Sequence, residues 1–336
     1  MDIVISHKSA LEYWRQHASI KDAQQSRHRR KKLPDRSPDA SCLRANALNG
    51  FSLPLNALVS NANARRPSKK MQPHVLSGTV PGYGLISIDN GVYVSSPEFC
   101  FLQMATTLPL LELIELGFEL CGLFSKSSYV AGDRVRHGDF SGNSAQTVYH
   151  SNLDDNPQLT TVKKIRSFVE HMPNVRGRGR ALKALRYILD NSASPMEAKL
   201  VMLLCLPFRL GGYGFPSPEL NSRIDPVKAA RSYTNQTYFK CDLFWPHLSL
   251  AVEYDSDEFH TGTARIARDS RKRNALASLG ILVITVTREQ IKSTVQLEAV
   301  AKILAAGMNR RLRYKKQVFA KEHRRLHSAL IWSRPG

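Results

Sequence analysis

The sequence is poor in cysteine, and its few cysteines are not arranged in pairs. The 336 residues contain five cysteines, an odd number at scattered spacing and without a CxxC motif. This pattern argues against a disulfide scaffold and against a zinc ribbon. Reduced thiols are typical of the cytosol, so we expect a cytoplasmic protein without a disulfide-linked partner.

The sequence also lacks a long hydrophobic run. The longest apolar stretch, Leu200 to Phe208, falls far short of the about 20 residues that a membrane-spanning helix needs. The first residues have neither a basic segment nor an apolar core, so we expect no signal peptide. The sequence therefore predicts no membrane partner.

Acidic residues are scarce relative to basic ones. There are 28 Asp and Glu against 48 Lys and Arg, which gives a net charge of +20. A protein this basic is suited to a polyanion, because each neutralised phosphate releases counterions. We expect DNA as the partner, while basicity without any nucleic-acid partner stays open as an alternative.

Hydrophobic residues make up 42% of the chain, which is enough for packed cores, and the length favours two domains. Alternating strand and helix patterns predict an α/β, two-domain protein with a smaller α+β domain at the N-terminus. The predicted boundaries are an α+β domain at 1–130, a linker with short helices at 131–193, a second domain at 194–306 and a basic tail at 307–336. Ile281 to Val286 is continuously apolar, which favours a central buried strand.

Two predicted strands, 238–245 and 248–255, carry the residues with the clearest chemistry. If they pair as a hairpin, residue 245 faces 250, and Asp242 falls opposite Glu253 with Asp255 two positions further on. Like charges in such a position destabilise a sheet unless a cation relieves them. Oxygen ligands select a hard cation, so this pattern predicts Mg²⁺ bound by Asp242 and Glu253.

The order of these features resembles a known nuclease core. Six features follow one another in the chain. A predicted helix carries Glu197, and a predicted strand carries Asp242. An apolar strand then ends in Glu253 and Asp255. After it come His260, a basic helix with Arg268 to Arg273, and the apolar strand Ile281 to Val286. Residues 194–306 resemble the very-short-patch-repair (Vsr)-like and PD-(D/E)XK restriction-endonuclease-like domains. The resemblance implies a three-layer α/β/α core with a central mixed sheet. It also implies a Mg²⁺-dependent DNA endonuclease of bacterial defence or repair.

The resemblance and the residue chemistry together suggest a role for each site residue. Asp255 or Glu197 would add a ligand or hold a metal-bound water, and His260 would act as general base. The lysine that usually ends the third motif is replaced by Asp255, so His260, Lys272 or a second metal must substitute, or the site is silent. Five basic residues are predicted to contact nucleic acid, namely Arg268, Lys272 and Arg273 in the helix and Arg178 and Arg180 in a glycine-rich stretch.

Structural roles compete with several of these assignments. Glu197 follows Ser194 at the spacing of a capping box, which gives it a purely helical role. Asp269 and Arg273 are spaced for an ion pair on a helix surface. Trp245 suits a hydrophobic core at least as well as a base-stacking platform.

The N-terminal half carries a separate resemblance. Two segments resemble the effector part of the AbiEi family of bacterial abortive-infection antitoxins. They are Ile5 to Leu11, which contains Ser6 and His7, and Gly91 to Pro97. The alternative function is therefore an antitoxin-like DNA-binding regulator whose nuclease fold is catalytically silent. The sequence leaves the oligomeric state open.

Overall fold

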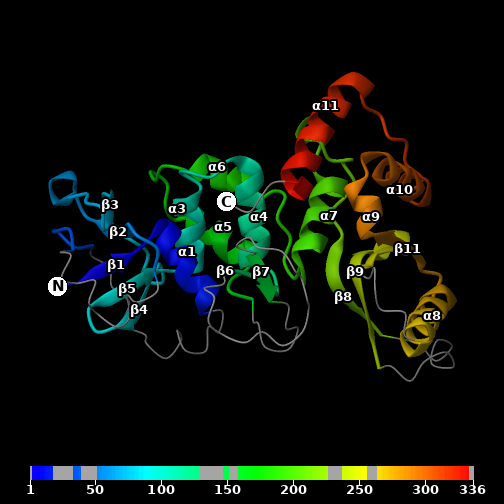
Figure 1. The fold of residues 1–336 in the computed structure, drawn as a ribbon, viewed down its shortest axis with the longest axis horizontal. Coiled ribbons are helices and arrows are strands. Elements are labelled where there is room, and N and C mark those ends of the chain that lie inside the picture. Colours follow the sequence, from blue (N-terminus) through cyan, green and yellow to red (C-terminus); the bar gives the residue numbers. More distant parts are fainter. Residues whose placement is uncertain are drawn as a thin grey trace. The chain divides into compact units, whose positions relative to one another are not determined.

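The chain forms two compact units, Met1–Asp190 (unit 1) and Asn191–Gly336 (unit 2). The structure, a computed structural model, describes residues 2–17, 33–38, 51–128, 147–150, 158–225, 237–255 and 263–332. Both units combine helices with a mixed β-sheet (Figure 1). The predicted α/β, two-domain architecture is confirmed at this level.

Unit 1 is built on a five-stranded mixed sheet with the strand order β3-β2-β1-β5-β4. Its strands are β1 (Ile3–Ile5), β2 (Leu55–Val59), β3 (Met71–Val75), β4 (Leu85–Asp89) and β5 (Val92–Ser95), and a separate pair is formed by β6 (Ser125–Ser128) and β7 (Thr147–His150). The helices are α1 (His7–Gln16), α3 (Pro97–Met104), α4 (Leu110–Leu120), α5 (Val162–Glu170) and α6 (Arg178–Ala184). Helices α5 and α6, from the predicted linker, pack against α3 and α4 inside the unit.

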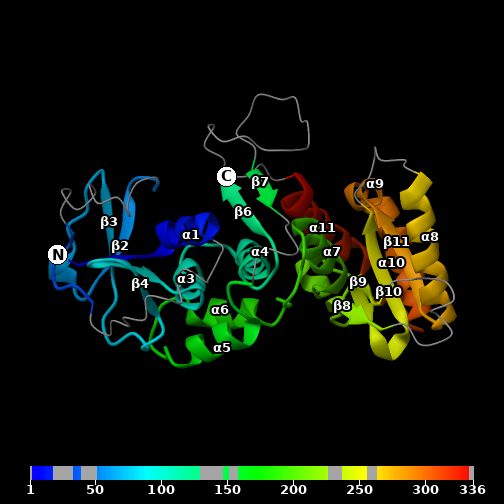
Figure 2. The same cartoon turned by 90° about the horizontal axis from the view of Figure 1, so that it is seen from below.

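Unit 2 has a four-stranded mixed sheet with the order β11-β10-β9-β8. Its strands are β8 (Glu219–Ile224), β9 (Phe239–Trp245), β10 (Leu250–Asp255) and β11 (Leu282–Thr287), and its helices are α7 (Pro195–Cys205), α8 (Thr263–Ser278), α9 (Arg288–Lys292), α10 (Thr294–Gly307) and α11 (Lys316–His327). The sheet lies between α7 on one face and α8 on the other (Figure 2). Strands β9 and β10 pair with Trp245 opposite Leu250, so the predicted hairpin register is confirmed.

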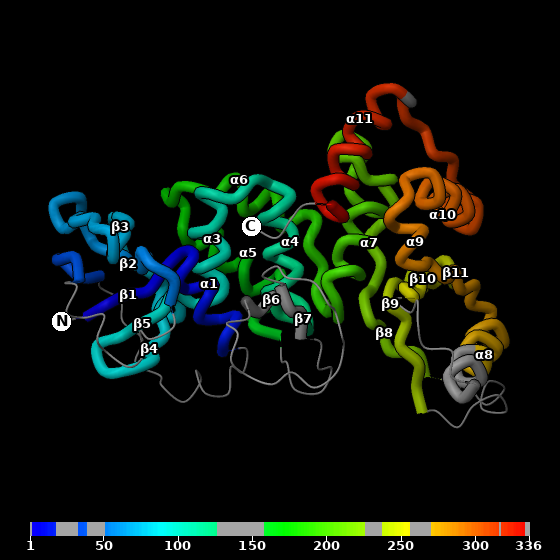
Figure 3. Tube along the Cα trace, in the orientation of Figure 1, coloured from blue at the N-terminus to red at the C-terminus, as the bar shows by residue number. Residues whose placement is uncertain are grey.

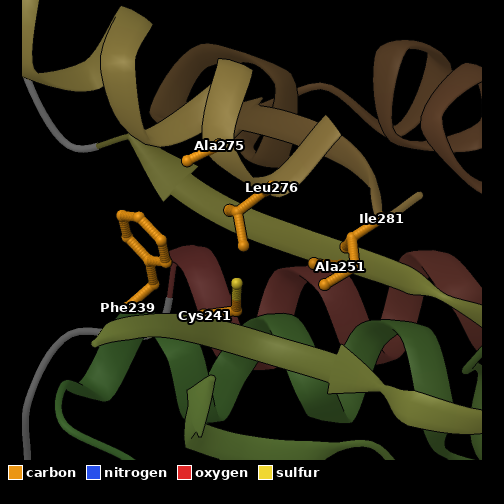
Figure 4. Close-up of a cluster of buried hydrophobic side chains, with 6 residues drawn as sticks. All are labelled: Phe239, Cys241, Ala251, Ala275, Leu276 and Ile281. Atoms are coloured by element: carbon orange, nitrogen blue, oxygen red, sulfur yellow. The ribbon is translucent and has the colours of Figure 1, made fainter. Parts of the chain in front are cut away.

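A small hydrophobic cluster fixes α8 to the sheet. Leu276 and Ala275 of α8 pack against Phe239 and Cys241 of β9 and Ala251 of β10, with Ile281 closing the cluster. The Cys241 side chain points toward Leu276 (Figure 4). Because Leu276 is fully buried, this contact determines where the rest of α8 lies above the strands.

The prediction of a central buried strand at 281–286 is wrong. Among the described strands, β11 is an edge of the sheet and pairs in parallel only with β10. Leu282 is 53% exposed, whereas Val286 is fully buried. A continuous apolar run is compatible with an edge strand as well as a central one, because its pattern does not report how many neighbours the strand has.

The segment predicted as a basic tail folds onto unit 2. In α11, the His323 ring Nδ1 donates to the Gly211 carbonyl at 2.7 Å, and the His327 ring Nε2 donates to the Ile291 carbonyl at 2.7 Å. Leu326 is 1% exposed. One face of α11 is therefore part of the core of the unit, whereas Lys321, Arg324 and Arg325 of the same helix are exposed. Figure 3 shows the chain running from α10 into α11.

Within the ranges given above, every helix is too short or too polar to cross a lipid bilayer. Cys100, Cys121, Cys205 and Cys241 are free thiols.

Candidate functional site

Asp242 lies in β9 where this strand stops pairing with β10. The last recorded pair is Leu243 with Val252, and the same register would next place Asp242 opposite Glu253. Instead, the backbone N–H of Tyr254 donates to Asp242 Oδ2 at 2.7 Å. The carboxylate therefore accepts a hydrogen bond that a strand carbonyl would otherwise take, and Asp242 is held at the point where the ladder ends.

Strand β8 connects Asp242 to helix α7 through Asn221. In the β8–β9 ladder Asn221 falls opposite Asp242. Its φ of 49° lies in the left-handed region, which Asn adopts more readily than most residues. The Asn221 Nδ2 donates to Glu197 Oε2 at 2.8 Å, and to the Asn191 carbonyl at 2.9 Å. The irregular strand thereby ties the first turn of α7 to the sheet beside Asp242.

Glu197 caps helix α7, and its carboxylate also lies close enough to Asp242 and Glu253 to influence the charge of this region. The Ser194 hydroxyl accepts the Glu197 backbone N–H at 3.2 Å, and the Glu197 carboxylate accepts the Ala193 N–H at 2.8 Å. These are helix-capping contacts. The side chain is also buried, and burial together with the charge of Glu253 raises the pKa of Glu197.

Glu253 is paired with a lysine from the helix above it. Lys272 Nζ of α8 lies 2.7 Å from Glu253 Oε2, and both side chains are about a quarter exposed, at 26% and 22%. The other oxygen, Glu253 Oε1, is buried and has no hydrogen-bond partner by geometry among the described residues, and the Cys241 thiol lies close to the same carboxylate. A buried carboxylate oxygen without a donor is costly, so this atom is suited to accept a further positive group.

The electrostatic environment raises the pKa of Asp242 to about 7. Burial is the main cause, and the charges of Glu197 and Glu253 add to it. The Tyr254 N–H and the Lys272 ammonium oppose the shift without cancelling it. The structure thus brings Asp242, Glu253 and Glu197 into one electrostatically coupled group, with Lys272 as its cation.

Of the other predicted catalytic residues, only Asp255 lies among the described residues. Asp255 is exposed at the end of β10 and is not among the charges that shift the pKa of Asp242. His260 lies outside the described residues, as does the side chain of Arg268. Arg273 is exposed on α8, and its contact with nucleic acid stays a prediction. Lys272 was predicted to contact nucleic acid, but in the structure its ammonium binds Glu253.

Arg178 and Arg180 make structural contacts in unit 1. Arg180 Nη1 donates to the carbonyls of Ala105 and Leu108, at 3.0 and 2.9 Å, beyond the C-terminal end of α3. Arg178 Nε donates to the Val169 carbonyl at 3.3 Å. Both arginines belong to helix α6, which follows a left-handed turn at Gly177 with φ 91°. These hydrogen bonds occupy some of the guanidinium N–H groups that were predicted to contact nucleic acid.

Sequence reasoning did not find Asn221 or the pairing of Lys272 with Glu253. The spacing of Lys272 on α8 placed it near the site, but only the packing of Leu276 shows that the helix turns this side chain toward β10. Asn221 had no sequence signal, because a single Asn in a strand gives no indication of a positive φ. Both residues are placed by contacts between elements far apart in the sequence.

Asp242 and Glu253 are the two carboxylates that could hold a magnesium ion. Mg²⁺ is usually held by one or two carboxylates, with water and substrate oxygens completing its shell. Asp242 and Glu253 supply these carboxylates, and the unpartnered Glu253 Oε1 offers a ligand atom. In the part of the chain that the structure describes, no three His, Cys, Asp or Glu side chains converge to hold a metal as they stand. A site of this kind therefore depends on water and substrate for its remaining ligands.

Comparisons with known proteins add little about activity. No protein-family model and no solved structure matches the chain. It is similar to two curated Mycobacterium tuberculosis proteins, from strains CDC 1551 / Oshkosh and H37Rv, both named as uncharacterized proteins. Each is 29% identical over 141 residues, 40% of this chain and 46% of the relative. The chain thus matches less than half the length of each relative, and both family resemblances stay predictions.

Proposed function

We propose that unit 2 is a Mg²⁺-dependent DNA endonuclease of the PD-(D/E)XK, Vsr-like type. The observation that carries this proposal is that Asp242 accepts the Tyr254 N–H, next to Glu253, at the place where β9 and β10 separate. A mixed sheet between two helical layers and the register of the hairpin agree with the core that this family implies. The net charge of +20 supports a polyanionic substrate.

Each side chain of the cluster has a role in this proposal. Asp242 and Glu253 bind the cation, which polarises a phosphoryl oxygen and acidifies an attacking water when it is bound. Glu197 keeps α7 and Asn221 in place and adds negative charge beside Asp242. Lys272 takes over from the missing motif lysine, since its ammonium reaches Glu253 from α8 and not from the strand itself.

The degree of ionisation of Asp242 sets the pH dependence of this activity. Because the pKa of Asp242 is about 7, this carboxyl group is largely protonated in mildly acidic solution and cannot bind a cation well. Cleavage should therefore increase as the pH rises through 7.

Plasmid nicking tests the proposal. The full chain is incubated with supercoiled plasmid and Mg²⁺, beside Asp242→Asn and Glu253→Gln. We expect each variant to lose at least 100-fold in cleavage rate, because each lacks one of the two charged ligands. Asp255→Asn is the matched control, an acid of the same strand outside the cluster, and it should keep most of the activity.

Three results would contradict the proposal. The first is nicking that survives in both Asp242→Asn and Glu253→Gln, and the second is equal loss in Asp255→Asn. The third is absence of nicking by the wild type across divalent metals and DNA forms.

A second candidate function is a DNA-binding regulator with a silent nuclease fold. The contact that favours it is the Lys272–Glu253 ion pair, which already neutralises one of the two carboxylates. In this case the wild type binds DNA in a salt-dependent manner without cutting it. Lys272→Met would then leave DNA binding almost unchanged and would not create cleavage.

A further inference from the structure

Helix α10 presents an apolar stripe to solvent. Its buried side packs into unit 2 through Leu297, Val300, Ala301, Leu304 and Ala305. On the opposite side Val295 is 76% exposed and Ile303 55% exposed, and Ala299 and Ala306 are exposed as well. These four residues follow the spacing i, i+4, i+8 and i+11, which places them on one narrow face of a helix.

The stripe continues onto the edge of the sheet. Helix α10 contacts β11, and a Cβ on Gly307 would lie 3.6 Å from Leu282 Cδ2. Leu282 is itself 53% exposed on β11, the strand with a neighbour on one side only among the described strands. Single exposed apolar residues are ordinary, but a helical stripe that meets an open strand edge forms a continuous apolar surface.

The surface chemistry excludes two kinds of occupant. The flanks of the stripe carry Gln296 on one side, and Glu298 with Lys302 on the other. Lys302 is already paired with Glu298 at 3.0 Å, so the surface offers a polyanion little net positive charge. A membrane-surface helix would need a wider apolar face and a polar face rich in Lys and Arg.

The stripe is complementary to itself. If a second copy packs its α10 antiparallel across a two-fold axis near residue 301, Ile303 of one copy faces Ala299 of the other. In the same arrangement Val295 faces Gly307, so each large side chain meets a small residue. Glu298 comes near Lys302 of the second copy, where the charges attract. Such small-to-large packing lets two helices approach closely.

We propose that the α10 stripe (Val295, Ala299, Ile303 and Ala306) and the adjacent Leu282 edge form the interface of a homodimer. A stable dimer buries roughly 800 Å² on each partner. A helix of 14 residues is about 21 Å long and supplies only part of this area, so the Leu282 edge of the sheet must contribute the rest.

Sedimentation velocity of the full chain over a range of micromolar concentrations tests the dimer. We expect a species of about 75 kDa, twice the 37.7 kDa of one chain, in exchange with monomer. Ile303→Glu and Val295→Glu should each raise the dimer dissociation constant at least tenfold. Val318→Glu is the matched control, because Val318 is 62% exposed on α11 and lies outside the stripe.

A crosslinking experiment gives an independent readout that does not depend on a destabilising change. Ala299→Cys lies close to the proposed axis, so its thiol should crosslink to itself with a short bismaleimide. Ala320→Cys, at an exposed alanine of α11, should not crosslink. A wild type that stays monomeric at every concentration overturns the proposal. So does a dimer that both stripe variants and Val318→Glu affect equally, or equal crosslinking through both cysteines.

Discussion

Asp242 is a buried acid next to other acids, and this determines how it responds to pH. The folded protein holds a proton on Asp242 up to about pH 7, whereas the unfolded chain loses it near the ordinary value of 3.8. In that window the folded state binds more protons, so stability decreases as the pH rises. A cation bound beside Asp242 would offset this loss of stability, because it favours the ionised form of the carboxyl group.

Asp242→Asn should therefore stabilise the protein in mildly alkaline solution without metal. Asn keeps an oxygen for the Tyr254 N–H but carries no charge to bury. We expect a gain in unfolding free energy of at most about 4 kcal/mol near pH 8, vanishing toward pH 4. Urea unfolding in EDTA at both pH values measures it, with Asp255→Asn as the exposed control. If Asp242→Asn changed the unfolding free energy equally at both pH values, ionisation of the buried Asp242 would carry no cost, and the raised pKa would be contradicted.

Lys272 supplies the positive charge that compensates Glu253. Lys272→Met leaves that carboxylate partly buried without its cation, which should destabilise the fold by about 1–2 kcal/mol at neutral pH. The double change Lys272→Met with Glu253→Gln should recover most of the loss, because it removes the charge together with its partner. Denaturant unfolding of the wild type, Lys272→Met, Glu253→Gln and the double variant completes this double-mutant cycle. Additive losses would mean that the 2.7 Å contact contributes nothing to stability.

At the level of elements, helix α8 positions Lys272. The helix packs against β9 and β10 through Leu276 and Ala275 (Figure 4). Lys272 comes four residues, about one helical turn, before Leu276. The ion pair with Glu253 therefore depends on a hydrophobic contact that is separate from the charges. This separation makes the two contributions distinguishable by mutation.

Leu276→Ala should lower the stability of unit 2 by about 2–5 kcal/mol, the usual range for a fully buried leucine. The control Val318→Ala changes a side chain that is 62% exposed on α11 and outside the proposed interface, and it should cost well under 1 kcal/mol. Both are measured by thermal and denaturant unfolding. Equal losses in the two variants would contradict the assignment of Leu276 to the core.

Local sequence patterns predicted most helices and strands, but they did not predict which helices and strands contact one another. The hairpin register followed from strand alternation, and the Ser194 cap of α7 followed from its spacing to Glu197. The place of β11 at an edge was missed, since an apolar run does not reveal its neighbours. The position of Glu197 beside Asp242 depends on its hydrogen bond with Asn221 in the irregular strand β8, which no local pattern encodes.

At the level of the whole molecule, the boundary between the two units falls at Asp190 and Asn191. Unit 2 has its own sheet, its own buried cluster and a C-terminal helix that completes it. Residues 307–332 belong to this core through Leu326, His323 and His327, although their composition looks like a basic tail. The proposed endonuclease therefore includes α11 as a structural part.

A protein of residues 191–336 should fold by itself and unfold in one cooperative transition. A shorter protein of residues 191–306 lacks α11 and leaves the carbonyls of Gly211 and Ile291 without their histidine donors. We expect the shorter protein to lose cooperative unfolding or at least about 3 kcal/mol of stability. Circular dichroism during heating compares the two. Equal stability would mean that 307–332 is dispensable to the fold.

The most direct test of the account is cation binding at Asp242 and Glu253. Mn²⁺ is a suitable spectroscopic substitute for Mg²⁺, and titration of the full chain followed by electron paramagnetic resonance counts the bound ions. We predict one site that takes up Mn²⁺ more tightly at pH 8 than at pH 6, with release of a proton near pH 7. Asp242→Asn and Glu253→Gln should each weaken binding at least tenfold, and Asp255→Asn should not. Binding that is absent in the wild type, or unchanged in the first two variants, would contradict the proposal that these carboxylates form a metal site.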